Sequence, residues 1–190
     1  MDLITVEKRD ISKKPKQLRR SGFVPGNIFG GTLQEPVAIQ IDEATASRLV
    51  RLKREGSKLR LALDGQVIPV QIKEKMQNNL SNEIIHISFQ ALKADQKVNS
   101  VVHILVKNAD KVSGTLERLM LEIPYASLPA DMIDTITIDV DGLPVGSVIR
   151  VGDIPELQNE KIDLQVDKES IVLRTSEKKR AAAEVQEEEF

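Results

Sequence analysis

The residues best suited to binding chemistry are seven basic side chains near the start of the chain. They are Lys8, Arg9, Lys13, Lys14, Lys16, Arg19 and Arg20, and residues 8–31 contain a single acid, Asp10. Like charges this close repel one another, and a polyanion such as a nucleic-acid backbone relieves that repulsion with its phosphates. Composition alone leaves a second interpretation open, in which the cluster is a solvated basic face.

Proline and glycine residues predict the local structure around this basic cluster. Pro15 suits the first position of a helix and Gly22 suits its stop, so the basic side chains of residues 16–20 are expected on one short exposed turn and a half. Further along, Gly30 and Gly31 permit positive φ or a close approach of the backbone to a large partner. We therefore expect a basic segment followed by a segment whose glycines set the conformation of the backbone.

Residues 18–30, LRRSGFVPGNIFG, resemble the signature LRxxGxxPaxxYG of the bacterial ribosomal protein family numbered twenty-five in the large subunit, which includes the general stress protein CTC. Five positions match: Leu18, Arg19, Gly22, Pro25 and Gly30. Gly26 and Asn27 depart from the signature, and Phe29 replaces a tyrosine, which keeps a stacking face and removes a hydroxyl. The resemblance spans roughly residues 4–89 and implies a small β-barrel that binds loop E of 5S rRNA.

A strand expected over residues 84–91, IIHISFQA, carries one of the two histidines. Alternation places Ile85, Ile87 and Phe89 inward and His86, Ser88 and Gln90 outward. An outward histidine between polar neighbours favours a ligand contact, and the segment resembles the family element HxDF, whose His and Asp face the RNA. Ser88 replaces that Asp, so a carboxylate contact cannot be made from this position. The other histidine, His103, lies in an apolar stretch and is expected to be structural.

The resemblance and the charge pattern together give a set of candidate RNA-binding residues. These are Arg9, Lys13, Lys14, Lys16, Arg19, Arg20, Phe29, Gly30, His86 and Ser88. The basic side chains are expected to neutralise phosphates, while the sheet face bearing Phe29 and His86 reads a widened minor groove by its shape.

The two halves of the chain carry opposite net charge. Residues 1–93 hold 16 Lys and Arg against 10 Asp and Glu, or +6, and residues 94–190 hold 11 against 19, or −8, which sum to −2. A chain of 190 residues with 41% hydrophobic content can form two cores. We therefore expect a basic RNA-binding domain over 1–93, an acidic domain over 94–175 and a disordered charged tail over 176–190.

Alternating hydrophobicity and turn residues predict a mainly β fold, with an N-terminal small β-barrel carrying one or two short helices and a C-terminal all-β domain. The first half predicts strands over 3–9, 26–29, 36–41, 58–63, 67–73 and 84–91, and helices over 16–21 and 43–55. The second half predicts strands over 100–107, 115–125, 135–140, 148–151, 162–166 and 170–174. Residues 128–154, LPADMIDTITIDVDGLPVGSVIRVGDI, resemble the C-terminal domain of the longer CTC-type family members.

The sequence contains none of the motifs that carry common enzyme chemistry. There is no Walker loop, no dinucleotide glycine fingerprint, no HExxH, no GxSxG and no Cys. Asp139 and Asp141 are interpreted as a solvated strand face, because no third ligand lies nearby in the sequence. We therefore expect no catalytic residue, no cofactor and no metal site.

The expected function is that of a structural ribosomal protein that binds 5S rRNA in the large subunit. Its expected partners are 5S rRNA and the neighbouring rRNA and proteins, and it is expected to be cytoplasmic and monomeric away from the ribosome. The sequence has no apolar signal core and no run of roughly 18 apolar residues, so no membrane contact is expected. Two alternatives stay open: a stress-induced interaction protein whose acidic domain recruits a protein, and a tRNA-binding module similar in fold to the anticodon-binding barrels of glutaminyl-tRNA synthetase.

Overall fold

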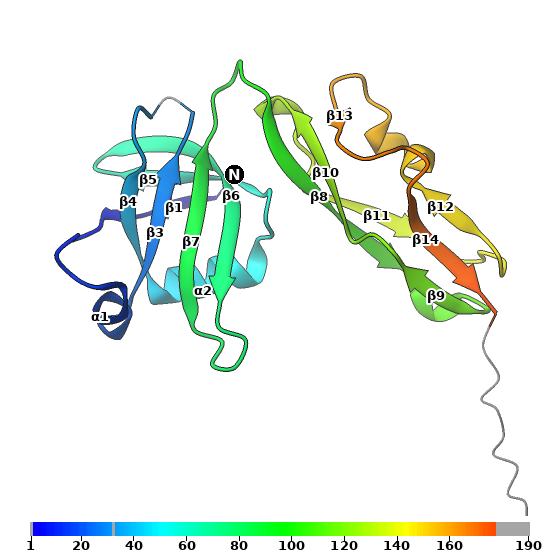
Figure 1. The fold of residues 1–190 in the computed structure, drawn as a ribbon, viewed down its shortest axis with the longest axis horizontal. Helices are drawn as coiled ribbons and strands as arrows, with labels where there is room; N and C mark the ends of the chain where they lie inside the picture. The colour runs from blue at the N-terminus through cyan, green and yellow to red at the C-terminus, as the bar shows by residue number, and fades with distance from the viewer. Residues whose placement is uncertain (1, 32, 178–190) are drawn as a thin grey trace, which may run out of the picture.

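The structure, a computed structural model, describes residues 2–31 and 33–177 and arranges them in two β regions (Figure 1). We call residues 2–92 the barrel region and residues 98–177 the second region. The elements of the barrel region are β1 (Leu3–Thr5), β2 (Glu7–Lys8), α1 (Pro15–Arg20), β3 (Phe23–Phe29), β4 (Val37–Asp42), α2 (Glu43–Leu52), β5 (Lys58–Leu63), β6 (Gln66–Gln77) and β7 (Ile84–Ala91). The mainly β fold with two short helices is confirmed.

The seven strands of the barrel region form one sheet that nearly closes on itself. The strand order is β1-β5-β6-β7-β3-β4-β2, so the two edge strands are β1 and β2. These edges are consecutive in the chain, with only Val6 between them, and the Val6 amide donates to the carbonyl oxygen of Ala62 at 2.9 Å. A sheet whose two edges are joined by one residue leaves little unpaired edge, which is the benefit of a barrel.

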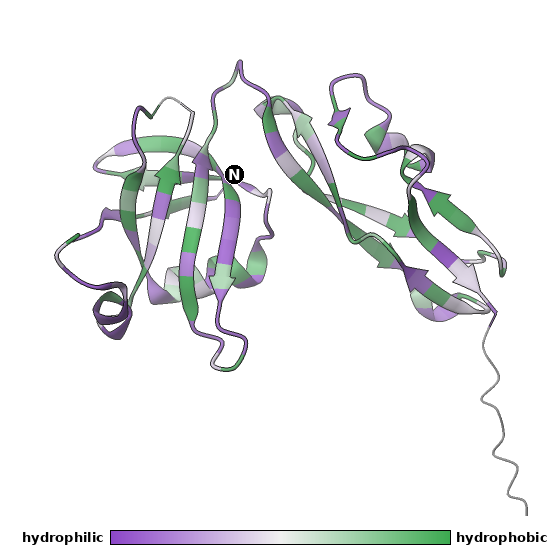
Figure 2. Ribbon diagram, viewed as in Figure 1, coloured by the Kyte–Doolittle hydropathy of each residue, from purple (hydrophilic) through white to green (hydrophobic). Residues whose placement is uncertain are grey.

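The core of the barrel region is aliphatic, as the low aromatic content requires. The fully buried side chains that the strands contribute are Ile28, Ile39, Ile41, Leu59, Leu61, Val70, Ile72, Ile87 and Phe89. Hydrophobic and hydrophilic residues alternate along these strands (Figure 2), so one face of each strand packs inward. The sequence-based assignment is wrong at one position, because Ile84 joins the core while Ile85 is only half-buried. The pairing of β6 with β7 shifts register between Met76 and Gln77, which accounts for the change.

Helix α2 covers one end of the barrel. Asp42 caps it as predicted, and its side chain accepts a hydrogen bond from the Thr45 amide at 3.1 Å. Ala46 and Leu49 are buried against the barrel core. The helix ends at Leu52 and not at residue 55, because Lys53 is already extended with φ −117° and ψ 143°.

The second region contains two smaller sheets. Its strands are β8 (Val98–Lys107), β9 (Thr115–Arg118), β10 (Glu122–Ser127), β11 (Thr135–Asp139), β12 (Val148–Arg150), β13 (Asp163–Leu164) and β14 (Ile171–Ser176). One sheet has the order β11-β8-β10-β13 and the other β12-β14-β9. Four short 3₁₀ turns connect them: Ala109–Lys111, Pro129–Asp131, Val151–Asp153 and Pro155–Leu157.

The predicted strand over residues 115–125 is two strands, β9 and β10, in different sheets. The amides of Leu119 and Met120 both donate to the Val172 carbonyl of β14, after which the Ile104 amide of β8 donates to the Leu121 carbonyl. The chain therefore crosses from one sheet to the other at residues 119–121. Leu119 and Leu121 are more than half exposed at this crossing, which period-two alternation could not reveal.

Several hydrogen bonds join the barrel region to the second region. Lys58 Nζ donates to the Pro129 carbonyl at 2.9 Å, and Gln71 Nε2 donates to the Asn99 carbonyl at 3.1 Å. His103 is buried with its Nε2 2.8 Å from the Glu55 carbonyl oxygen. Its predicted structural role is confirmed, and the structure adds that it connects the two regions.

Candidate nucleic-acid interface

The outer face of the barrel sheet carries a row of small residues and one acid on neighbouring strands. Asn27 on β3 is paired with Ala38 on β4 and with Ser88 on β7, and Ser88 is paired in turn with Glu74 on β6. Residues paired across strands share a face, so these four side chains form one row across the sheet. Because Asn27, Ala38 and Ser88 are small, this part of the row is flat, and the exposed Glu74 stands at its end.

His86 lies on the same outer face and is held by Asn27. The His86 Nε2 atom is 3.2 Å from Asn27 Oδ1. Burial lowers the pKa of His86, the positive charge of Arg9 lowers it further, and the carboxylate of Glu74 opposes the shift. The ring is therefore uncharged at neutral pH, and when Nε2–H donates to Asn27 the other nitrogen, Nδ1, is an acceptor.

Two polar atoms beside this row are buried without a hydrogen-bond partner among the described residues: Arg9 Nε and Gln40 Oε1. The rest of each side chain is engaged, because Arg9 Nη2 donates to the Lys13 carbonyl at 3.2 Å and Gln40 Nε2 donates to Glu7 Oε2 at 2.9 Å. Buried polar groups are rarely left unpaired in folded proteins. A donor and an acceptor are thus held in place, each with unused hydrogen-bonding capacity.

The basic segment lies next to this face, and its cations differ in how free they are. Lys14, Lys16 and Arg20 are exposed, and no ion pair to them is found in the described part of the chain. Lys13 is weakly paired with Asp10 at 3.7 Å, and Lys8 is paired with Asp64 at 2.8 Å.

Arg19 departs from the expectation of a free, exposed turn. Its side chain is only 19% exposed, and its Nε donates to Glu83 Oε1 at 2.6 Å. The helix that carries it is as predicted, starting at Pro15, burying Leu18 and ending before Gly22, whose φ is +82°. The correction concerns the charge, because Glu83 already neutralises Arg19 within the protein.

The glycine pair adopts the positive φ that the sequence predicted, with +75° at Gly30 and +61° at Gly31. The close approach at Gly31 is to the protein itself, since a Cβ there would lie 2.9 Å from the Cβ and the carbonyl oxygen of Ala91. Gly26 has the same role in the middle of β3, where a Cβ would lie 2.7 Å from the Ile87 carbonyl oxygen. Phe29 is half-buried at the end of β3, opposite Gln90.

The sequence reasoning missed Asn27, Gln40 and Glu74 as members of this face. Only the strand register brings them beside His86 and Ser88, and the register depends on a shift between Ile72 and Glu74 on β6. Glu74 is the most informative of the three. It places a carboxylate opposite Ser88, the position from which no carboxylate contact was expected.

The remaining candidates have ordinary surface roles. Asp139 accepts from Asn108 Nδ2 and from the Asp141 amide, and these hydrogen bonds lower the pKa of Asp139. Asp141 is ion-paired with Lys111 at 2.7 Å. Within residues 2–31 and 33–177, no group of three or more potential ligands could hold a metal ion. No helix in the same residues is long and apolar enough to cross a membrane.

A nearly closed barrel bearing a basic turn and a flat polar face, joined to a second β region, is a mainly β architecture whose first region is suited to binding a polyanion. Residues 4–89 match the model of the Ribosomal L25p family, and residues 96–179 match the model of the ribosomal protein TL5, C-terminal domain. The chain belongs to the Ribosomal L25p family and carries the TL5 C-terminal domain. This family membership confirms the predicted family, and with it the prediction that the chain is a ribosomal protein rather than an enzyme.

Curated relatives cover most of the chain at modest identity. A protein of Nitrosomonas europaea named large ribosomal subunit protein bL25 is 27% identical over 92% of this chain and 91% of its own length. A protein of the same name from Caldanaerobacter subterraneus is 25% identical over 99% of this chain and 96% of its own length. A third, from Bacillus licheniformis, is 26% identical over 82% of this chain and 76% of its own length.

Proposed function

We propose that the protein is a component of the large ribosomal subunit that binds 5S rRNA, at its loop E region, through the barrel region. The observation that carries the proposal is the position of a basic turn, whose Lys14, Lys16 and Arg20 have no ion pair in the described residues, beside a flat polar sheet face with two unpartnered buried groups. Positive charge next to hydrogen-bonding groups on a rigid sheet suits a folded RNA, whose backbone is anionic and whose minor groove is wide and shallow. Family membership and the names of the relatives support the same assignment.

The basic segment supplies the electrostatic part of the interaction. Lys13, Lys14, Lys16 and Arg20 contact phosphates, and the partly exposed guanidinium group of Arg9 adds a fifth cation. Five neutralised phosphates give a slope of log K against log salt of about −3.5 to −4.5.

The sheet face supplies the shape-dependent part. Neutral His86 accepts from RNA donors such as 2′-hydroxyl groups through Nδ1, and Phe29 and Gly30 border this surface at the end of β3. Ser88, 9% exposed, keeps the centre of the face flat. Glu74 supplies from β6 the carboxylate that Ser88 lacks, placed to accept from an exocyclic amine of a base.

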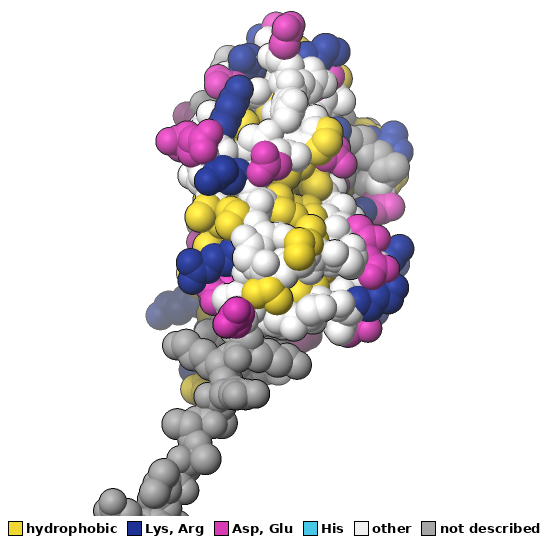
Figure 3. All heavy atoms as spheres, turned by 90° about the vertical axis from the view of Figure 1, so that its right-hand side faces the viewer, with side chains coloured by type: hydrophobic (Ala, Val, Ile, Leu, Met, Phe, Trp, Pro, Cys, Tyr) yellow, Lys and Arg dark blue, Asp and Glu magenta, His cyan; other side chains and the backbone are white. Residues whose placement is uncertain are grey.

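The second region is proposed to have a separate task. We divide the chain into a 5S-rRNA-binding domain over 1–93 and an acidic domain over 94–175; the proposed tail over 176–190 lies almost wholly outside the described residues. Exposed large apolar side chains of the second region are Leu105, Leu119, Leu121, Val145 and Val148. Apolar side chains gather on its outward end, bordered by charges (Figure 3), which favours the alternative of a protein-interaction module for this domain.

A gel-shift titration of the full chain against 5S rRNA and an unrelated RNA duplex tests the proposal at several salt concentrations. We expect a clear preference for 5S rRNA and weaker binding by the double variant Lys16→Ala with Arg20→Ala. The matched control is Arg51→Ala with Arg54→Ala, which removes two exposed cations from α2 and its C-terminal flank. Equal affinity for both RNAs, or equal losses in both double variants, would contradict the proposed site.

Replacing Glu74 tests the sheet face separately from the charge. Glu74→Gln removes a negative charge, so a purely electrostatic interface would bind RNA more tightly. If the carboxylate contacts a base, Glu74→Gln weakens binding instead, and Asp139→Ala, which removes an exposed acid from the second region, leaves it unchanged.

A further inference from the structure

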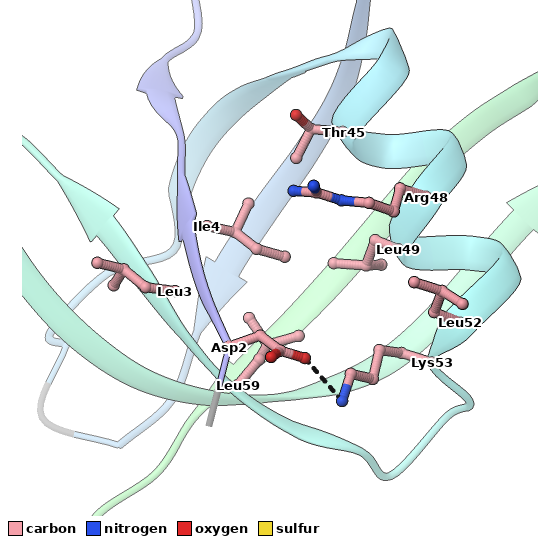
Figure 4. A pocket seen from close by; sticks show the side chains of 9 residues that line it. All are labelled: Asp2, Leu3, Ile4, Thr45, Arg48, Leu49, Leu52, Lys53 and Leu59. Carbon is pink, nitrogen blue, oxygen red and sulfur yellow. Dashed lines mark ion pairs between the residues drawn. The ribbon is translucent and has the colours of Figure 1, made fainter.

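A groove on another side of the barrel combines an apolar lining with positive charge. It lies between β1 and α2, has a volume of about 310 Å³ and is lined by residues of β1, α2 and β5 (Figure 4). Leu49 and Leu59 are buried and form its floor. On β1, Ile4 points toward α2 and Leu3 points away from it, whereas Leu52 stands on the α2 wall with 65% of its surface exposed (Figure 4). Leu52 and the floor thus form an apolar surface that nothing in the described residues covers.

The rim of the groove is cationic. The guanidinium group of Arg48 reaches across the groove toward β1 (Figure 4), and no hydrogen bond or ion pair from it is found in the described residues. Lys53 stands at the other end, paired with Asp2 at 2.8 Å. Residues 48–54 also contain Arg51 and Arg54, so four cations lie in seven positions with no acid among them.

The sheet order places this groove away from the proposed RNA interface. The groove is formed at β1 and β5, while the proposed RNA interface is centred on β3 and β7 and extends to β4 and, at Glu74, to β6. In a nearly closed sheet these are different sides of the barrel. Both surfaces can therefore be occupied at once.

We propose that the groove docks an acidic protein segment carrying a bulky aliphatic side chain. The aliphatic side chain packs on Leu52 above the buried floor, and a neighbouring carboxylate pairs with Arg48. This arrangement covers Leu52 and gives Arg48 an ionic partner, so the chemistry of the groove and of the segment match on both counts.

An RNA occupant fits the same groove less well. Phosphates would satisfy Arg48, but ribose and phosphate would place polar groups against Leu52, so its burial would not bring two apolar surfaces together. No aromatic side chain lines the groove, so a base has no ring on which to stack. The apolar lining therefore favours a protein partner, and the barrel region would connect RNA on one side to protein on the other.

Photo-crosslinking in assembled ribosomes tests the occupant directly. The full chain, with p-benzoylphenylalanine in place of Leu52, is expressed in cells of its own species, and ribosomes are isolated, irradiated and analysed by mass spectrometry. We expect a crosslink to an acidic segment of a protein. The control position is Val67 on β6, which is 53% exposed and does not line the groove. A crosslink to RNA at position 52, or none at position 52 in ribosomes that contain the variant, would overturn the proposal.

A binding measurement on the purified full chain gives a second, independent test. The probe is a fluorescent peptide that alternates glutamate and leucine, compared with a peptide in which serine replaces leucine. We expect Leu52→Ser and Arg48→Glu each to weaken binding of the first peptide about tenfold, because one loses apolar burial and the other reverses a contacting charge. Arg51→Glu makes the same charge change on the same helix outside the groove, and a loss of no more than about threefold is expected.

Two outcomes of this measurement count against the proposal. Equal affinity for the leucine and serine peptides would show a purely electrostatic attraction, and equal losses for Arg48→Glu and Arg51→Glu would show that the groove is not the site. All three variants should retain 5S rRNA binding. A variant that loses RNA binding and peptide binding together would assign the groove to RNA and overturn the protein partner.

Discussion

The ion pair between Arg19 and Glu83 gives the sharpest test of how the basic segment works. If Glu83 neutralises Arg19, as the 2.6 Å contact indicates, then Arg19 contributes little to RNA attraction in the native protein. Glu83→Gln should then release one cation beside the proposed RNA interface. The prediction is a gain: the variant binds 5S rRNA more tightly than the native chain.

The size of the gain follows from counterion release. One additional neutralised phosphate steepens the slope of log K against log salt by about 0.7 to 0.9, which corresponds to an affinity gain of about four- to fivefold at 0.15 M salt. Loss of the ion pair should cost less than about 1 kcal/mol of unfolding free energy, because the Glu83 side chain is 46% exposed. The gain in binding is thus expected in a protein that remains folded.

The assay is fluorescence anisotropy with labelled 5S rRNA at salt concentrations from about 0.05 to about 0.3 M, over which log K is expected to be linear in log salt. The control is Glu156→Gln, which removes an exposed acid from the second region and should leave the slope unchanged. Arg20→Ala should flatten the slope by one phosphate, whereas Arg19→Ala should leave it nearly unchanged. Equal flattening by Arg19→Ala and Arg20→Ala would refute the reasoning, because it would mean that Arg19 leaves Glu83 for the RNA.

Three further predictions concern stability. Gly26→Ala should lower the unfolding free energy by about 1 to 3 kcal/mol in urea titrations, since its Cβ would lie 2.7 Å from a carbonyl oxygen of β7. Gly56→Ala should speed proteolysis between the two regions, because its Cβ would lie 2.6 Å from a carbonyl oxygen of β8. The control is Gly65→Ala, which has a similar φ and open space around it and should not speed proteolysis. In the folded protein the pKa of His86 lies below its usual value of 6.5. The stabilisation that neutral His86 provides is therefore complete above pH 6.5 and is lost as the pH falls through the pKa of the folded state. Urea titrations at several pH values should show this loss in the native chain and less of it in His86→Gln, and parallel curves would contradict it.

Patterns confined to neighbouring residues predicted the fold well. The Asp64-Gly65 hairpin turn, the Asp42 cap and the Pro15 helix start all depend on local chemistry, and each is present in the structure. The sequence failed where the outcome depends on distant residues. Alternation in residues 115–125 could not show that the chain changes sheets, and the charge of Arg19 could not show that Glu83, 64 residues away, would neutralise it.

The same limit explains why the face around His86 could be predicted only in part. Histidine was identified by its position on a strand, but its neighbours Asn27 and Glu74 come from two other strands and are set by register. A one-residue slip of β6 would turn Glu74 to the inner face, so the shift between Ile72 and Glu74 decides where the carboxylate lies. A chain that has Ser88 in place of an acid can therefore still present a carboxylate at that point of the surface. The position of the carboxylate on the surface matters more than the strand that carries it, so β6 can supply it as well as β7.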